Sequence, residues 1–187
     1  MPSYIKPTDL KKALDCLNRG GVIAYPTEAV YGLGCDPFNP EAVNRLLHIK
    51  QRSADKGLIL VAASWDQVEA LTEPVPPSAL AQAMTTWPGP FTWVFPSSAK
   101  TPLWIRGKFP SIALRVSAFP IIQELCIAYR KPIVSTSANR GGEPPLRDFR
   151  SMQIMFSNEV DFIVPGKVAG LPKPTLIRDI LSGEVLR

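Results

Sequence analysis

Histidine and cysteine are scarce in this sequence, and their scarcity excludes several kinds of site. The 187 residues include one histidine, His48, and three cysteines, Cys16, Cys35 and Cys126. A single histidine excludes a three-histidine zinc site and the H-E-x-x-H motif. No two cysteines form a C-x-x-C pair, so we expect reduced, buried thiols and no metal site made by the protein alone. His48 falls near the end of an expected helix, where we interpret it as structural.

Long apolar runs are also missing. The run from Leu58 to Ala63 is among the longest, and it is too short to span a bilayer. The first residues, Met1 to Lys6, lack the basic and then apolar pattern of a secretory signal. We therefore expect a cytoplasmic protein without membrane contact.

Three motifs for nucleotide or ester chemistry are absent: G-x-x-x-x-G-K-[ST], G-x-G-x-x-G after a strand, and G-x-S-x-G. The net charge is +5, from 21 Lys and Arg against 16 Asp and Glu. This charge favours an anionic partner such as a nucleotide or RNA, although the basic residues are spread along the chain.

Expected helices and strands alternate, which predicts an α/β or α+β fold with a mixed sheet in a single domain, 1–187. We expect helices after a Thr8 cap, after Asn39-Pro40, from a capping box at Ser64, and over 78–85, 120–129 and 146–156. We expect strands over 22–25, 58–61, 91–95, 112–116, 133–134, 162–164, 175–180 and 184–186.

One polar connection contains three cations close together, Lys50, Arg52 and Lys56. A connection tied to packed elements at both ends can hold such cations in an array that suits a polyphosphate. The alternative is a solvated charged loop, which most charge-rich loops are.

Two further segments are candidate ligand loops. Residues 26–34 follow a buried strand and combine glycine with hydroxyl side chains, and residues 135–142 offer Ser135, Thr136, Ser137 and Asn139 before two glycines. Glycine lets a backbone approach a ligand closely, and small polar groups can orient it. Each segment could instead be a simple turn packed on the sheet.

Arg115 stands among apolar residues in the expected strand 112–116. Burying an unpaired arginine is costly, so Arg115 should face either an acidic protein group or an anionic ligand. Together with the cationic and polar loops, it fits a reaction achieved by positioning and electrostatics, such as nucleotidyl transfer.

Four segments, in this order and spacing, resemble the YrdC/TsaC family of threonylcarbamoyl-AMP synthases: residues 26–34, Lys50-x-Arg52, Leu114-Arg115-Val116 and 135–139. The resemblance covers essentially the whole chain and the length is similar to that of the short bacterial form. It implies a twisted mixed α/β sheet around a concave, positively charged cavity.

The resemblance also implies an activity. L-threonine, bicarbonate and ATP would give L-threonylcarbamoyl-AMP and pyrophosphate.

 The Mg²⁺ would be carried by the ATP phosphates. Other proteins would then transfer the threonylcarbamoyl group to an adenosine of tRNA, and direct binding of tRNA or other RNA is a further expectation. The competing class is a non-catalytic module that binds tRNA or double-stranded RNA through its basic cavity.

Site residues are carried over from the resemblance by position. The family's catalytic set matches Lys50, Arg52, Ser137 and Asn139. We predict ATP contacts from Lys50, Arg52, Lys56, Ser111, Ser137, Asn139 and Arg187. We predict threonine contacts from Thr27, Ala29, Tyr31, Arg115, Ser135 and Thr175, with Arg115 holding the carboxylate.

The sequence departs from the family pattern at three places. Ser53 stands where many relatives have proline, and Val61 stands where some longer relatives have histidine. Arg140-Gly141-Gly142 replaces a common Ser-Gly pair.

Overall fold

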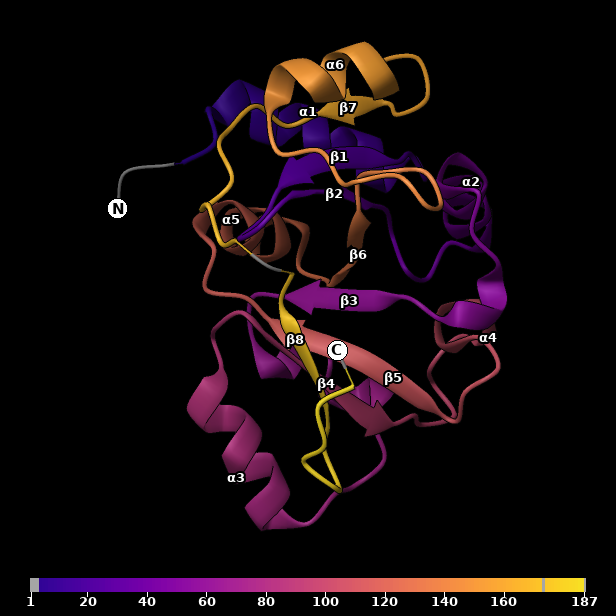
Figure 1. Cartoon of the computed structure of the whole chain (residues 1–187), viewed down its shortest axis with the longest axis vertical. Helices are drawn as coiled ribbons and strands as arrows, with labels where there is room; N and C mark the ends of the chain where they lie inside the picture. The colour runs from indigo at the N-terminus through magenta and orange to yellow at the C-terminus, as the bar shows by residue number, and fades with distance from the viewer. Residues whose placement is uncertain (1–3, 173, 187) are drawn as a thin grey trace.

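The computed structural model describes residues 4–172 and 174–186. Over these residues, eight strands form one open mixed sheet in the order β7-β1-β2-β6-β3-β5-β4-β8 (Figure 1). The strands are β1 Ile23–Pro26, β2 Tyr31–Gly34, β3 Ile59–Ala62, β4 Phe91–Pro96, β5 Ser111–Val116, β6 Ile133–Ser137, β7 Phe162–Ile163 and β8 Leu176–Asp179. Parallel and antiparallel neighbours both occur, so the predicted mixed α/β sheet is confirmed.

Helices pack around this sheet, with α1 and α6 near β7 and α3 at the opposite end of the molecule (Figure 1). The α-helices of the described residues are α1 Pro7–Asn18, α2 Pro40–Lys50, α3 Pro77–Thr86, α4 Leu103–Arg106, α5 Pro120–Tyr129 and α6 Phe149–Phe156. The short 3-10 helices are η1 Ala54–Lys56, η2 Trp65–Gln67 and η3 Glu69–Leu71. Within the described residues, no helix has the length and apolar character needed to cross a membrane.

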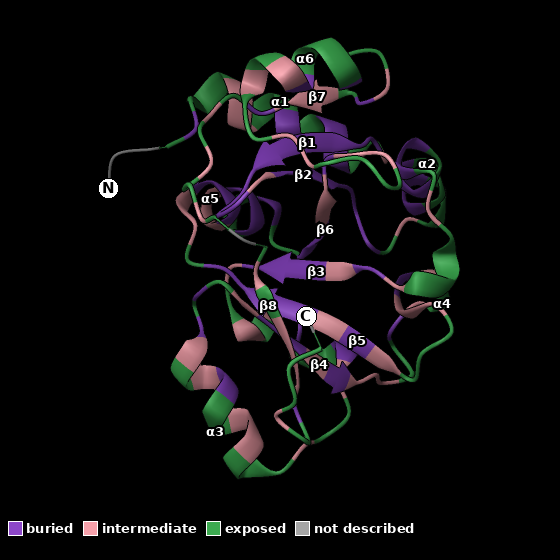
Figure 2. Cartoon of the chain, in the orientation of Figure 1, coloured by how far each residue is buried: buried purple, intermediate pink, exposed green. Residues whose placement is uncertain are grey.

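Two hydrophobic cores lie on the two faces of the sheet. Ile23 and Tyr25 belong to the core that α1 and α5 cover, whereas Val22 and Ala24 belong to the larger core with α2, α3 and α6. This alternation follows from the opposite directions of successive side chains along a strand. Figure 2 shows the result, with buried strands inside and exposed outer helix faces. The three cysteines are free and buried, as predicted.

The start of α2 is set by its sequence and was predicted. Asn39 Oδ1 accepts hydrogen bonds from the backbone N–H of Glu41 at 3.0 Å and of Ala42 at 3.1 Å. Pro40 occupies the first helical turn, where a missing N–H costs nothing. The helix therefore begins at a fixed point and brings Lys50 to its last position.

Two predicted helix starts were wrong. Thr8 lies inside α1, which begins at Pro7 without a side-chain cap, because proline already favours the first turn. Ser64 makes no capping bond, and only the 3-10 helices η2 and η3 follow it. Gln67 instead accepts the backbone N–H of Ala63 at 2.9 Å and donates to Cys126 O at 2.8 Å, which ties it to α5. The helix expected over 146–156 begins at Phe149, since Asp148 caps it.

Three expectations for strands and loops were also wrong. Residues 31–34 and 135–137 are not loops, because β2 and β6 pair with each other inside the sheet, Gly32 opposite Ser137. Their polar and glycine-rich composition favoured a loop prediction, although both segments are central strands. Residues 184–186 do not form a strand, and only a single bridge joins Val185 to Arg178.

Candidate active site

The ammonium of Lys50 is the centre of a polar cluster at the end of β6. Lys50 is 4% exposed, and its Nζ donates to Ser137 O at 2.6 Å, Asn139 Oδ1 at 2.7 Å and Asn139 O at 2.8 Å. Ser137 Oγ lies 3.4 Å from the same Nζ and donates to Asn139 Oδ1 at 2.6 Å. Burial, assisted by the charge of Arg52, lowers the pKa of Lys50 to about 8. The lysine thus fixes the turn after β6.

Backbone contacts hold this turn against the end of α2. Gly141 N donates to Lys50 O at 3.1 Å, and Asn139 Nδ2 donates to Glu143 O at 2.6 Å and to Arg140 O at 3.1 Å. The amide of Asn139 is therefore used by its own turn. Lys50 and Asn139 organise the site from within the protein and do not line either of the two hollows described next.

The first hollow, which we call the Arg115 hollow, lies over β2, β6 and the start of β3 and encloses about 300 Å³. It combines hydroxyl groups, small apolar side chains and two arginines. It is lined by Thr27, Ala29, Val30, Gly32, Arg52, Leu58, Ile59, Arg115, Ser135, Thr136, Ser137, Pro145, Pro174 and Thr175.

The second hollow, the Lys56 hollow, encloses about 290 Å³ and is lined by both cationic and apolar side chains. It is lined by Arg52, Lys56, Gly57, Leu58, Ile59, Val94, Ile105, Arg106, Phe109, Ser111, Ala113, Ile177 and Leu186. Arg52, Leu58 and Ile59 line both hollows, which places the two side by side. Arg52 donates to Gly57 O at 3.0 Å, a contact that holds its side chain across the connection after α2.

Of the two partners that the sequence left open for Arg115, the structure shows the acidic protein group. It is 5% exposed, and its NH2 lies 3.4 Å from Oε2 of the buried Glu28. Its NH1 donates to Thr175 Oγ1 at 2.9 Å, and its Nε is buried without a hydrogen-bond partner among the described residues. The guanidinium is thus held by an acidic group and still lines the Arg115 hollow.

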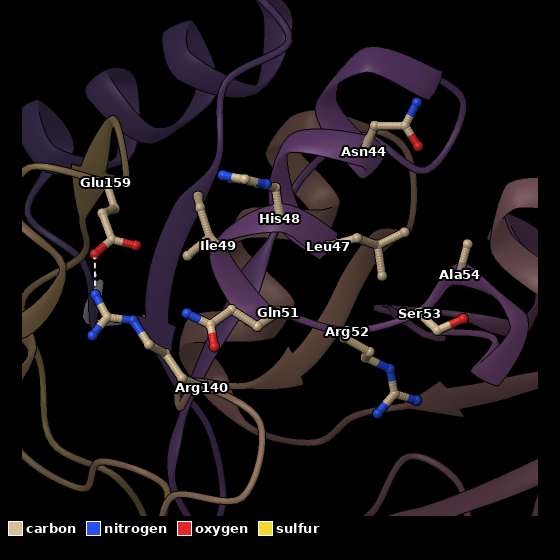
Figure 3. Close-up of a pocket in the computed structure, with 10 residues that line it drawn as sticks. All are labelled: Asn44, Leu47, His48, Ile49, Gln51, Arg52, Ser53, Ala54, Arg140 and Glu159. Carbon is tan, nitrogen blue, oxygen red and sulfur yellow. Dashed lines mark hydrogen bonds and ion pairs between the residues drawn. The ribbon is translucent and has the colours of Figure 1, made fainter.

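A third hollow, the outer hollow, lies on the outside of α2 and encloses about 540 Å³ (Figure 3). Its wall includes His48, which is exposed, and Arg140, which forms an ion pair with Glu159 at 2.5 Å. Figure 3 shows Gln51 on the wall between Arg140 and Arg52. Arg52 is also part of this wall, so the outer hollow begins where the other two meet.

The predicted site residues fall into five groups. Arg52, Ser137, Thr27, Ala29, Arg115, Ser135 and Thr175 line the Arg115 hollow, and Arg52, Lys56 and Ser111 line the Lys56 hollow. Lys50 and Asn139 support the turn behind them. Tyr31 is fully buried, and its hydroxyl donates to Gly166 O at 2.7 Å and so faces the loop before β8. Arg187 lies outside the described residues.

The three departures from the family pattern have local explanations. Ser53 Oγ accepts the backbone N–H of Asp55 at 3.2 Å and so starts η1. Val61 is buried in the core beneath α5. Arg140 is paired with Glu159, and Gly141 carries the backbone bond to Lys50.

Sequence reasoning missed Glu28 and the apolar wall of the Lys56 hollow. The prediction that Arg115 needs an acidic or anionic partner pointed to a residue of the Glu28 type, but spacing alone does not identify it. Ile105, Phe109 and Leu186 come from three separate segments, and no local pattern links them.

Comparisons with known proteins identify the family of this chain. The model of the Sua5/YciO/YrdC family, whose description reads "Telomere recombination", matches residues 15–187. The chain belongs to this family, which confirms the resemblance found in its motifs. A protein of Coxiella burnetii (strain RSA 493 / Nine Mile phase I) named threonylcarbamoyl-AMP synthase is 54% identical over 178 residues, covering 95% of this chain and 96% of that protein. One of Marinobacter nauticus with the same name is 46% identical, covering 100% and 97%.

Solved structures show the same fold. A double variant of P. abyssi Sua5 superposes with a TM-score of 0.92 at 31% identity, over 98% of this chain. This chain spans 57% of that longer protein. P. abyssi Sua5 in complex with L-threonine superposes with a TM-score of 0.85 at 32% identity, over 91% of this chain and 50% of that one.

Proposed function

We propose that this chain joins L-threonine, bicarbonate and ATP to form L-threonylcarbamoyl-AMP and pyrophosphate. Relatives that match nearly its full length carry the name threonylcarbamoyl-AMP synthase, so the chain is such a synthase and a nucleotidyltransferase. The structural observation that best supports the reaction is the pair of adjoining hollows that share Arg52 beside the Lys50 cluster. Two substrates of different chemistry could bind there side by side.

Threonine is proposed to occupy the Arg115 hollow. A planar guanidinium suits a carboxylate, and Arg115 is part of the wall of this hollow. Thr27, Ala29, Ser135 and Thr175 would surround the rest of the amino acid. The similar P. abyssi Sua5 protein was solved in complex with L-threonine, which supports threonine as a ligand of this fold. Tyr31 would act indirectly, by holding the loop at Gly166.

ATP is proposed to occupy the Lys56 hollow, with its phosphates at the Arg52 side. Ile105 and Phe109 offer apolar surface for a base, while Lys56 and Ser111 can contact charged or hydroxyl groups. Arg187, although outside the described residues, remains a proposed ATP contact. The two hollows together would form the concave, positively charged cavity expected from the resemblance.

The chemistry requires positioning more than a side-chain nucleophile. The threonine amine attacks the carbon of bicarbonate, and loss of water gives a carbamate. An oxygen of this carbamate then attacks the α-phosphorus of ATP, and pyrophosphate leaves. Arg52 would offset the negative charge that develops between the two hollows. Lys50 would hold Ser137 in place through the turn it fixes. One histidine suffices because bicarbonate supplies the nucleophilic oxygen.

Mg²⁺ is proposed to arrive on the triphosphate, where it would neutralise charge and polarise the phosphorus. In the part of the chain that the structure describes, no group of three or more His, Cys, Asp and Glu is placed to hold a metal ion. A metal bound mainly by phosphate oxygens fits this donor set.

The decisive experiment is the release of pyrophosphate with labelled bicarbonate. Release should require both L-threonine and bicarbonate, and label should enter the nucleotide product. Lys50→Ala and Arg52→Ala should abolish it while the fold persists, whereas Lys11→Ala, on the exposed side of α1, should not. Near-normal turnover in both site variants would rule the assignment out.

We further propose that the product passes to proteins that modify tRNA in the cytoplasm. A module that only binds RNA would contact phosphates from its surface and would not need a buried arginine in a hollow of about 300 Å³. Arg115 therefore favours the enzyme over the non-catalytic alternative.

A further inference from the structure

Glu28 contacts Arg115 but does not itself line the Arg115 hollow. Glu28 is 7% exposed and Arg115 is 5% exposed. Glu28 Oε1 accepts the hydroxyl hydrogen of Ser117 at 2.6 Å, and Ser117 Oγ accepts the backbone N–H of Phe119 at 3.0 Å. The carboxylate is therefore fixed through a residue just beyond β5.

The contact between the two charges is incomplete. Glu28 Oε2 is 3.4 Å from Arg115 NH2, longer than the distance of roughly 2.7–2.9 Å typical of a charge-assisted hydrogen bond. Oε2 has no hydrogen-bond partner among the described residues, and neither has Arg115 Nε. Glu28 thus restrains the guanidinium electrostatically without using up its donors.

The backbone around Glu28 also bonds to the segment that precedes the other partner of Arg115. Thr27 O accepts the N–H of Ala169 at 3.2 Å, and Glu28 O accepts the N–H of Leu171 at 3.0 Å. This loop leads to Thr175, whose Oγ1 accepts from Arg115 NH1 at 2.9 Å. The turn between β1 and β2 therefore provides Glu28 and also bonds to Ala169 and Leu171.

We propose that Glu28 is a positioning residue that makes the Arg115 hollow selective for a carboxylate. It holds the guanidinium in one plane and leaves donors for the carboxylate of the amino acid. This inference rests on the proposed function, because it assumes that an amino acid binds in this hollow. A purely structural glutamate would support the fold without affecting which amino-acid derivative is accepted.

The test compares L-threonine with L-threoninamide, in which a carboxamide replaces the carboxylate. In Glu28→Gln, the amide keeps an acceptor for Ser117 and turns a donor toward the guanidinium. We expect kcat/KM for L-threonine to fall by roughly 10- to 100-fold through KM, with KM for ATP within about twofold of wild type. The same quantity for L-threoninamide should fall by less than about threefold, so that discrimination between the two is lost.

Calorimetric titration compares the binding of L-threonine and L-threoninamide directly, without turnover. Glu73→Gln, an exposed glutamate outside both hollows, is the matched control and should preserve discrimination. Ser117→Ala keeps the charge but frees Oε1, and should reduce discrimination by a smaller factor even if Glu28→Gln does not fold. An equal loss for both compounds, or unchanged discrimination in Ser117→Ala and Glu28→Gln, would overturn the proposal. Threonine binding without pyrophosphate release in wild type would instead count against the proposed function alone.

Discussion

Loss of the proton from Lys50 is expected to slow the reaction above a pH of about 8. Burial lowers the pKa of this ammonium from 10.5 to about 8, and the charge of Arg52 contributes. The ammonium has three N–H groups for the oxygen atoms of Ser137 and Asn139, whereas the neutral amine has two and carries no charge. The turn after β6 should therefore loosen as pH rises.

The magnitude follows from the bonds affected. A hydrogen bond to a charged group contributes about 1.5–3 kcal/mol. Losing one donor and weakening the others should therefore lower the free energy that holds the turn after β6 in place by about 3 kcal/mol. If that cost falls on the transition state, the rate drops by roughly 100-fold. Lys50→Met, which removes the amine altogether, should lose at least as much activity at neutral pH.

Stability should change in the opposite direction. Because the folded-state pKa lies below the value of 10.5 in the unfolded chain, the unfolded chain binds more protons between pH values of about 8 and 10.5. The contribution of Lys50 to the free energy of unfolding is therefore lowest below pH 8 and rises through this window, by up to about 3 kcal/mol. As pH increases, activity should therefore fall while the contribution of Lys50 to the free energy of unfolding rises.

The assay is the pH profile of pyrophosphate release, measured as kcat/KM for ATP from pH ~6.5 to ~9.5, because this parameter reports the free enzyme. Lys50→Arg keeps the charge across the whole range and should lose the alkaline decline, even if its maximum is lower. Both proteins use the same substrates, so a decline caused by the threonine amine would persist in both.

Two results would refute the reasoning. An identical alkaline decline in wild type and Lys50→Arg would assign the titration to another group. A constant difference in unfolding free energy between wild type and Lys50→Met from pH ~7.5 to ~9.5 would show that the pKa of Lys50 is not lowered by burial.

Two further predictions concern the shared wall and the centre of the sheet. Arg52→Lys should raise KM for both threonine and ATP by roughly tenfold, because Arg52 lines both hollows; a change confined to one substrate would contradict the side-by-side arrangement. Gly34→Ala should lower the free energy of unfolding by about 2–3 kcal/mol and Tm by about 4–10 °C, because the new methyl group would meet Val134 O at 2.5 Å and Tyr25 Cε1 at 2.7 Å. Thermal unfolding measures this loss, and an unchanged Tm would mean that β2 and β6 can separate at little cost.

Local sequence patterns predicted several elements well. Asn39 and Pro40 fixed the beginning of α2, and the apolar positions of 120–129 predicted α5 over its observed range. These features depend on residues within one or two helical turns, so neighbouring side chains contain the required information. The motif segments likewise identified most residues that line the Arg115 hollow, through their resemblance to a family.

Patterns failed where distant contacts decide the structure. Residues 135–137 are polar and looked like a loop, yet pairing on both sides makes them part of β6. The capping box at Ser64 was lost because Gln67 bonds to Cys126 of α5 instead. In each case, a tertiary partner outweighed a weak local preference.

The amino-acid sequence by itself determined which chemical groups this protein has: few histidines and cysteines, a cationic connection, a hydroxyl-rich segment and one arginine in an apolar strand. Only the tertiary structure decided how they are used. It joined Lys50 to Ser137 across 87 residues and placed Glu28 against the end of β5 across 89. The physical reason is that a buried charge must find its partners wherever packing brings them, and packing is a property of the whole sheet.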